Sequence, residues 1–193
     1  MRSILTALAF TVAVAFQTGP TRVAPDNPEL NQMYKMDQSE REGANVDWTA
    51  LYRHDIERRA RLKKLLEDGK VQSATDYFHA GMIYQHGQTP DDYLLAHLLA
   101  VTAISKSSKD ARWLSAATMD RYLRSIWQPQ VYGTQFSRLS DKEPWSHESM
   151  NKELVSDNMR AAICVVALSK QLEDLAKTGT NGVPGRTSIE DCD

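Results

Sequence analysis

The sequence predicts an all-α protein, a compact domain of about six helices that includes a repeat-like antiparallel helical hairpin. Apolar residues recur every three to four positions from residue 28 onward, which is the period of an amphipathic helix. No segment shows the apolar–polar alternation of a strand, and glycines or prolines end most periodic segments. The 193 residues, of which 41% are hydrophobic and 25% charged, suffice for a single core.

The first four helices have recognisable boundaries. We expect the first over residues 28–41, before Gly43, and the second from Asp47, as N-cap, to a stop before Gly69. The third covers about 73–86. A fourth opens at Thr89-Pro90-Asp91-Asp92, where Thr caps, Pro occupies the first helical position and the aspartates favour the positive end of the helix dipole.

The second half of the chain is less regular. We expect a fifth helix over about 110–127, an irregular stretch with Pro129, Gly133 and Pro144, and a sixth helix over about 149–175. The glycine- and proline-containing segment 177–193 is expected to be a disordered tail.

The first 19 residues have the pattern of a secretory signal. Arg2 gives a basic start, residues 4–16 form an uncharged apolar run, and Ala13 and Ala15 supply an A-x-A arrangement. The alternative is an uncleaved N-terminal anchor, and this would be the only membrane attachment. We therefore expect an exported protein, periplasmic or extracellular, in which a linker at 20–27 precedes a single helical domain at 28–176.

Charge and cysteine content restrict the partners. The net charge is −2, with 23 basic and 25 acidic residues interspersed, so there is no basic surface for nucleic acid. Cys164 lies in an apolar run and is either a buried thiol or the disulfide partner of Cys192. No sequence motif for a metal or a cofactor is present, and we expect neither.

Charged residues interrupt the apolar stripes of the first two helices. Asp37 and Arg41 continue the stripe of the first helix, and Asp55 with Arg58 or Arg59 interrupts that of the second. A charge on a buried stripe must be paired or hydrogen-bonded. These residues predict either a buried polar site or inter-helix salt bridges at a solvated edge.

Histidines lie on the next two helices. His79 and His86 are seven residues apart on one helix face, about 10 Å along the axis, which is too far to share one metal ion. His97 lies on the core-facing side of the fourth helix and is expected to hydrogen-bond a carboxylate or a carbonyl.

A polar loop follows Asp120-Arg121-Tyr122. Its residues, Gln130-Val131-Tyr132-Gly133-Thr134-Gln135, provide neutral donors and acceptors, and Gly133 allows a positive φ or a close backbone approach. The loop either orients a polar ligand or is a turn whose glutamines tie Asp120 and Arg121 into the core.

Four stretches together resemble a bacterial domain-of-unknown-function family. They are Asp37-Gln38-Ser39-Glu40-Arg41, Gln85-His86, Asp120-Arg121 and the Gln-x-Tyr-Gly-Thr-Gln string at 130–135, with a weaker match at Asp157 to Arg160. The resemblance implies a shared polar pocket and no known chemistry. Separately, Ala80 to Gly87 followed by Asp92-Tyr93, Ala96, Ala100 and Ala103 resembles one short Sel-type, tetratricopeptide-like repeat, which implies closely paired helices.

Three functions are compatible with these residues. The first is a binding or interaction module whose polar groove holds a protein, a peptide or a small polar ligand. The second is a hydrolase or lyase in which His86 is the general acid or base, Asp120 orients it, and Arg41 or Arg121 stabilises negative charge. The third is a purely structural polar network. The candidate ligand-binding residues are Asp37, Gln38, Arg41, His79, Gln85, His86, Asp120, Arg121, Gln130, Tyr132, Gly133, Thr134 and Gln135.

Overall fold

The computed structural model describes residues 24–43, 45–147, 149–180, 182–190 and 192. The expected signal or anchor at 1–19 lies outside these residues. Within them the protein is all-α and compact, as predicted, with seven helices and only isolated β-bridges. The helices are α1 (Pro28–Ser39), α2 (Trp48–Glu67), α3 (Ala74–Tyr84), α4 (Pro90–Ser105), α5 (Ala111–Ser125), α6 (Asp157–Ala162) and α7 (Leu168–Thr178).

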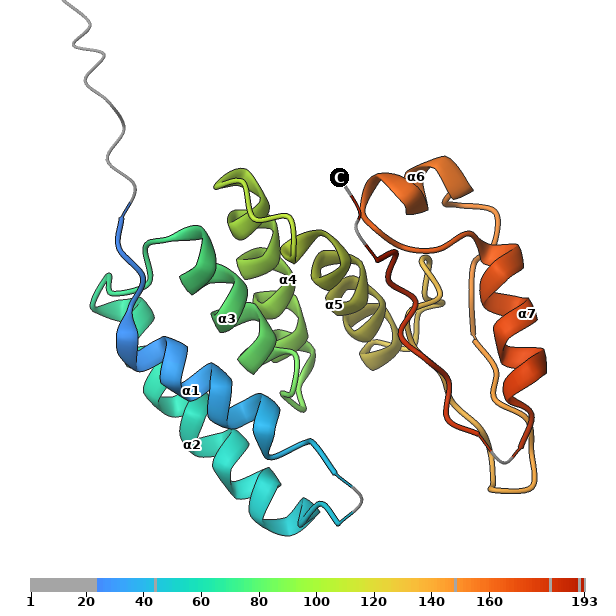
Figure 1. Cartoon of the computed structure of the whole chain (residues 1–193), viewed down its shortest axis with the longest axis horizontal. Helices are drawn as coiled ribbons and strands as arrows, with labels where there is room; N and C mark the ends of the chain where they lie inside the picture. The colour runs from blue at the N-terminus through green and yellow to red at the C-terminus, as the bar shows by residue number, and fades with distance from the viewer. Residues whose placement is uncertain (1–23, 44, 148, 181, 191, 193) are drawn as a thin grey trace, which may run out of the picture.

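Helices α1 to α5 pack side by side, and α6 and α7 lie beyond α5 with the C-terminal segment (Figure 1). The main core lies among α1 to α4 and contains Leu30, Leu62, Leu65, Val71, Ala80, Ile83, Tyr84, Ala96 and Leu99. Helices α3 and α4 approach closely at Gly81, where an added Cβ would lie 3.3 Å from the Ala96 carbonyl oxygen. Small residues therefore set the spacing of this helix pair.

The predicted helix starts of the first half are confirmed. The Asp47 carboxylate accepts hydrogen bonds from the backbone of the first turn of α2. Ser73 and Thr89 each form a capping box, with Asp76 and Asp92 respectively three residues later. These side chains satisfy backbone N–H groups that a helix leaves unpaired at its start.

The prediction of one helix over 149–175 is wrong. Helix α6 begins after Ser156, which caps it, and the chain then leaves helical geometry until α7. Cys164 has φ +65°, a conformation that ends a helix. The following residues pair with the C-terminal segment, through hydrogen bonds from Val166 N–H to the Thr187 carbonyl (3.0 Å) and from Ile189 N–H to the Cys164 carbonyl (2.8 Å). Pairing with a distant segment thus replaces helical hydrogen bonding here.

The expectation of a disordered tail also differs from the structure. Residues 182–190 run back along the α6–α7 connection, and Thr187 is buried. A disulfide joins Cys164 and Cys192, whose Cα atoms are 5.5 Å apart. The tail contains few apolar residues, but backbone pairing and this covalent bond order it.

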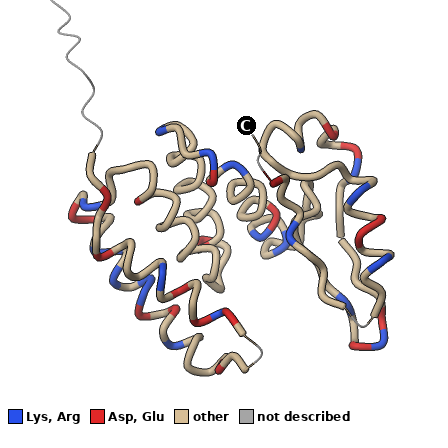
Figure 2. The backbone as a smooth tube through the Cα atoms, viewed as in Figure 1, with Lys and Arg blue, Asp and Glu red and all other residues tan. Residues whose placement is uncertain are grey.

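Charged residues recur along α1, α2 and α7, whereas α3 carries one and α4 two, both in its first turn (Figure 2). The two inner helices are therefore largely apolar. Among the helices of the described residues, none combines the length and the apolar character needed to span a membrane.

Candidate functional site

The first polar cluster surrounds Asp37, whose side chain is fully buried at the end of α1. The Arg41 guanidinium lies 3.0 Å from one Asp37 carboxylate oxygen, and that of Arg58, from α2, lies 3.5 Å from the same oxygen. Nδ1 of His86, which follows α3, lies 3.2 Å from the other carboxylate oxygen. Three segments of the chain therefore meet at one buried carboxylate.

Two further carboxylates complete this cluster. Nη2 of Arg41 donates to both oxygens of Asp55 at 2.8 Å, and Arg58 donates to Asp55 at 2.9 Å and pairs with Glu40 at 2.8 Å. Burial alone would raise the pKa of Asp55, but the hydrogen bonds from Arg41 and Arg58 hold that pKa below its ordinary value. The charges predicted on the first two helices are thus paired with one another.

The environment of His86 lowers its pKa, which favours the neutral imidazole. Burial lowers the pKa of His86, the hydrogen bond to Asp37 opposes this, and the positive charges of Arg41 and Arg121 lower it further. The carboxylate beside His86 belongs to Asp37. The expectation that Asp120 orients His86 therefore does not match the structure.

Asp120 is the centre of a second cluster, formed by α5 and the loop 130–135. Its fully buried carboxylate accepts hydrogen bonds from the backbone N–H groups of Val131 (2.8 Å), Tyr132 (3.0 Å) and Thr134 (2.9 Å) and from the Thr134 hydroxyl (2.8 Å). Four donors saturate this carboxylate. Asp120 therefore holds the loop in place, in agreement with the alternative that the loop is a turn tied into the core.

The two glutamines of the loop close it internally. The Gln130 side chain accepts from Gln135 N–H (3.0 Å) and donates to the carbonyls of Gln135 (2.9 Å) and His147 (2.8 Å). The Gln135 amide also donates to the Thr134 hydroxyl oxygen (3.1 Å) and lies 3.4 Å from the Ala117 carbonyl oxygen on α5. Gln130 is thus structural, whereas Gln135 also faces the pocket described below.

Gly133 and Tyr132 contact residues from the C-terminal helices. Gly133 has φ +80°, and an added Cβ would lie 2.2 Å from Oε1 of Gln171. The Gln171 amide donates to the carbonyls of Tyr132 (3.0 Å) and Val166 (2.8 Å). Arg160, 1% exposed, donates to the Val131 carbonyl at 3.1 Å.

Gln171 and Arg160, whose side chains hold the loop, were not among the site residues predicted from the sequence. Gln171 lies one turn before the buried Leu175 of α7. A polar amide on the apolar stripe of this helix could have indicated that Gln171 is buried and hydrogen-bonded. Arg160 was present in the weaker part of the family resemblance only. Neither the position of Gln171 on its helix nor the family resemblance at Arg160 indicates that these side chains contact the loop 130–135.

Arg121 lies where the two clusters approach each other. It lines a pocket of about 390 Å³ together with Gln88, Pro90, Tyr93, Arg124, Ser125 and Gln135. Its Nε atom is buried and has no hydrogen-bond partner, and no ion pair to Arg121 or Arg124 is found among the described residues. Burial lowers the pKa of Arg121, and the neighbouring positive charges of Arg124 and Arg41 lower it further. The pocket therefore holds uncompensated positive charge.

His79 and Gln85, predicted with the site, lie elsewhere. The His79 ring stacks on Tyr34 with centroids 4.0 Å apart, and the Gln85 amide donates to the sulfur of Met82. Gln38 contributes to the Asp37 cluster by donating to that carboxylate at 2.7 Å. Nδ1 of His97 lies 2.9 Å from the Ser115 carbonyl oxygen, as expected for a core histidine.

The pocket also contains residues that sequence reasoning did not select, namely Gln88, Tyr93 and Arg124. No group of three or more metal-ligating side chains occurs in the described part of the chain. Comparison with protein-family models, with curated proteins and with solved structures finds no match to this chain. The resemblances to a family and to a repeat therefore stay predictions.

Proposed function

We propose that this protein is an exported helical binding module whose Arg121 pocket takes a small polar ligand bearing a carboxylate or a phosphate. The observation that carries the proposal is the buried, unpartnered Nε of Arg121. Elsewhere in the described chain, the buried guanidinium groups of Arg58 and Arg160 have acidic side chains or carbonyls as partners. Nε of Arg58 makes no hydrogen bond either, but it lies 3.5 Å from an Asp37 carboxylate oxygen. An oxyanion would supply the missing acceptor, because guanidinium groups bind oxyanions through paired, charge-assisted hydrogen bonds.

The remaining side chains of the pocket suit such a ligand. Gln88, Ser125 and Gln135 provide neutral donors and acceptors, and Tyr93 provides a ring and a hydroxyl. The hydrogen bonds within the loop hold the Gln135 amide in position before a ligand binds. The signal-like start of the sequence and the disulfide support an oxidising compartment outside the cytoplasm.

A purely structural role describes the Asp37 cluster and the Asp120 cluster themselves. The carboxylates of Asp37 and Asp120 contact side chains and backbone groups of the protein itself, so both hold helices and loop in position. Catalysis by His86 is less well supported, because its imidazole does not line the pocket and Nδ1 already faces Asp37. These contacts favour a binding module in which the Asp37 and Asp120 clusters stabilise the fold and the Arg121 pocket binds the ligand.

The proposal is tested by titrating the oxidised protein with inorganic phosphate and, separately, with acetate, against sodium chloride at equal ionic strength. NMR shift changes should map to the pocket, and whichever oxyanion binds should bind at least tenfold more weakly to Arg121→Gln. The matched control is Arg53→Gln, because Arg53 is exposed on α2 and outside the pocket. Shifts caused by neither oxyanion, or equal affinity in Arg121→Gln and the wild type, would overturn the proposal.

A stability measurement separates binding from a structural role of the same residue. An unpartnered, partly desolvated charge costs folding free energy, so Arg121→Gln should be as stable as the wild type or more stable in the absence of oxyanions. A large loss of stability in this variant would show that Arg121 is part of the structural network and would also contradict the proposal.

A further inference from the structure

A second cleft shares no lining residue with the Arg121 pocket. Its volume is about 780 Å³, and it separates α1, α3 and α5 from the C-terminal segment. The lining residues are Tyr34, Phe78, Lys109, Asp110, Trp113, Cys164, Arg186, Ser188, Ile189 and Cys192. None of these residues belongs to the Asp37 cluster, the loop cluster or the Arg121 pocket.

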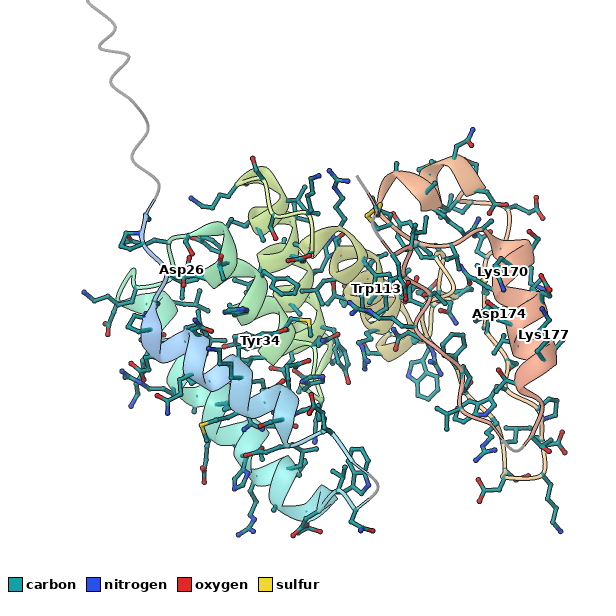
Figure 3. All side chains as sticks on the ribbon, viewed as in Figure 1. Asp26, Tyr34, Trp113, Lys170, Asp174 and Lys177 are labelled. Carbon is teal, nitrogen blue, oxygen red and sulfur yellow. A yellow bond between two sulfur atoms is a disulfide. The ribbon has the colours of Figure 1, made fainter. Side chains whose placement is uncertain are left out.

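Aromatic rings from three helices line this cleft. Tyr34 comes from α1 and Trp113 from α5, on the two sides of α3 (Figure 3), and Phe78 comes from α3 itself. The Tyr34 and Phe78 ring centroids are 6.0 Å apart with a tilt of 59°, and Tyr34 stacks on His79 behind it. Aromatic rings of α1, α3 and α5 therefore form part of the wall of this cleft.

The cleft also contains the guanidinium group of Arg186, an exposed residue, and the carboxylate of Asp110 in the same lining. The Arg186 guanidinium lies 3.8 Å from the Trp113 ring centroid, and no ion pair to Arg186 is found among the described residues. Partial burial lowers the pKa of Arg186, and the electrostatic interactions with Tyr34 and Asp110 oppose this. Stacking on Trp113 covers one face of the guanidinium and leaves its N–H groups in the plane available to an acceptor.

The tail that carries Arg186 is fixed in position. Thr187 is buried, its hydroxyl lies 3.3 Å from Nε1 of Trp113, and its carbonyl accepts from Val166. Both cysteines of the disulfide Cys164–Cys192 also line the cleft. The cation and the aromatic wall are therefore held facing one space.

We propose that this cleft binds a small aromatic carboxylate. The ring of the ligand packs among Tyr34, Phe78 and Trp113, and its carboxylate accepts the in-plane N–H groups of Arg186. The cleft volume exceeds that of a single benzene ring with a short acid chain, so the space suffices for such a ligand. This site is independent of the Arg121 pocket, and either proposal can fail alone.

The test compares three probes of similar size on the oxidised full-length protein. Phenylacetate has the ring and the charge, phenylacetamide lacks the charge, and cyclohexylacetate lacks the aromatic ring. We expect phenylacetate to bind at least tenfold more tightly than each of the others, with NMR shift changes at Phe78 and Trp113. Equal affinity for phenylacetate and either analogue, or shifts confined to other regions, would overturn the proposal.

Two arginine variants test whether Arg186 is the cation that binds the carboxylate of phenylacetate. Arg186→Gln should weaken phenylacetate binding at least tenfold and leave phenylacetamide binding unchanged. Arg138→Gln is the matched control, because Arg138 also stacks on a tryptophan, with its guanidinium 4.6 Å from the Trp145 ring centroid, outside the cleft. Shift changes confined to the Arg121 pocket would place the acid there, and the cleft proposal would be wrong.

Discussion

Nδ1 of His86 lies 3.2 Å from a carboxylate oxygen of Asp37, although 49 residues separate them in the chain. Both side chains were expected at a polar site, but with different partners. Their contact joins the end of α1 to the end of α3 and leaves Asp120 to the loop 130–135.

Asp37→Asn should destabilise the protein strongly. The substitution removes the charge that faces Arg41 and Arg58 in a buried position, and breaking a buried ion pair costs about 3 kcal/mol or more. Urea unfolding followed by circular dichroism measures this loss. Glu29→Gln, which breaks an exposed ion pair with Arg61, should barely move the unfolding midpoint. Similar midpoints for both variants would contradict the assignment of Asp37 as a buried support.

Gly133→Ala should destabilise the loop by about 2 kcal/mol, because alanine disfavours φ +80° and its Cβ would collide with the Gln171 amide. That amide is held by two hydrogen bonds and cannot move away without losing them. Thermal unfolding provides the measurement. Gly185→Ala is the control, since an added Cβ there meets open space. An unchanged melting temperature for Gly133→Ala would show that the loop adapts.

Acid should destabilise the protein through His147. Burial lowers the pKa of His147 to about 4, and both ring nitrogens are buried without a hydrogen-bond partner. The unfolded chain binds a proton at this residue below about pH 6.5, whereas the folded protein does not until about pH 4. The free energy of unfolding should therefore fall by roughly 2 kcal/mol as the pH drops from 6.5 to 4.

His147→Phe should flatten this pH dependence. Phenylalanine preserves the stacking on Phe136, whose ring centroid is 5.1 Å away, and carries no titratable group. Burial also lowers the pKa values of His79 and His86, so the variant should retain part of the acid sensitivity. Urea unfolding at pH 7, 6, 5 and 4.5 compares the slopes. Parallel curves for the variant and the wild type would refute the role of His147.

Cys192→Ser should release the C-terminal segment. The disulfide spans 28 residues, and opening a loop of this length costs about 3 kcal/mol in the chain-entropy model. Trypsin should then cleave after Arg186 faster than in the oxidised wild type. A reducing agent should produce the same change in the wild type and none in the variant. Equal cleavage rates with and without the disulfide would falsify this role.

Features that depend on neighbours in the chain were predictable. The start of α4 follows from Thr89, Pro90 and Asp92, because the cap and its partner are three residues apart. The pairing of Asp55 with Arg58 follows from helical spacing. In each case the interacting residues occupy one helix or one turn, so the pattern determines the contact.

Features that depend on distant segments were not predictable. The break between α6 and α7 arises from pairing with residues 187–189, which a local apolar period does not reveal. The same limit applies to the site. The residue types around Asp37 and Asp120 indicated buried polar clusters, but the unpartnered state of Arg121 depends on which carboxylates the fold places elsewhere.

The close packing of α3 on α4 and of α4 on α5 has a consequence for the order of assembly. These helices are consecutive in the chain, and α3 and α4 each begin with a capping box, so their association closes only short loops. The tail reaches its place by a contact between Trp113 and Thr187, 74 residues apart. During refolding, amide hydrogens of α3 to α5 should become protected from exchange first, and those of residues 187–189 last.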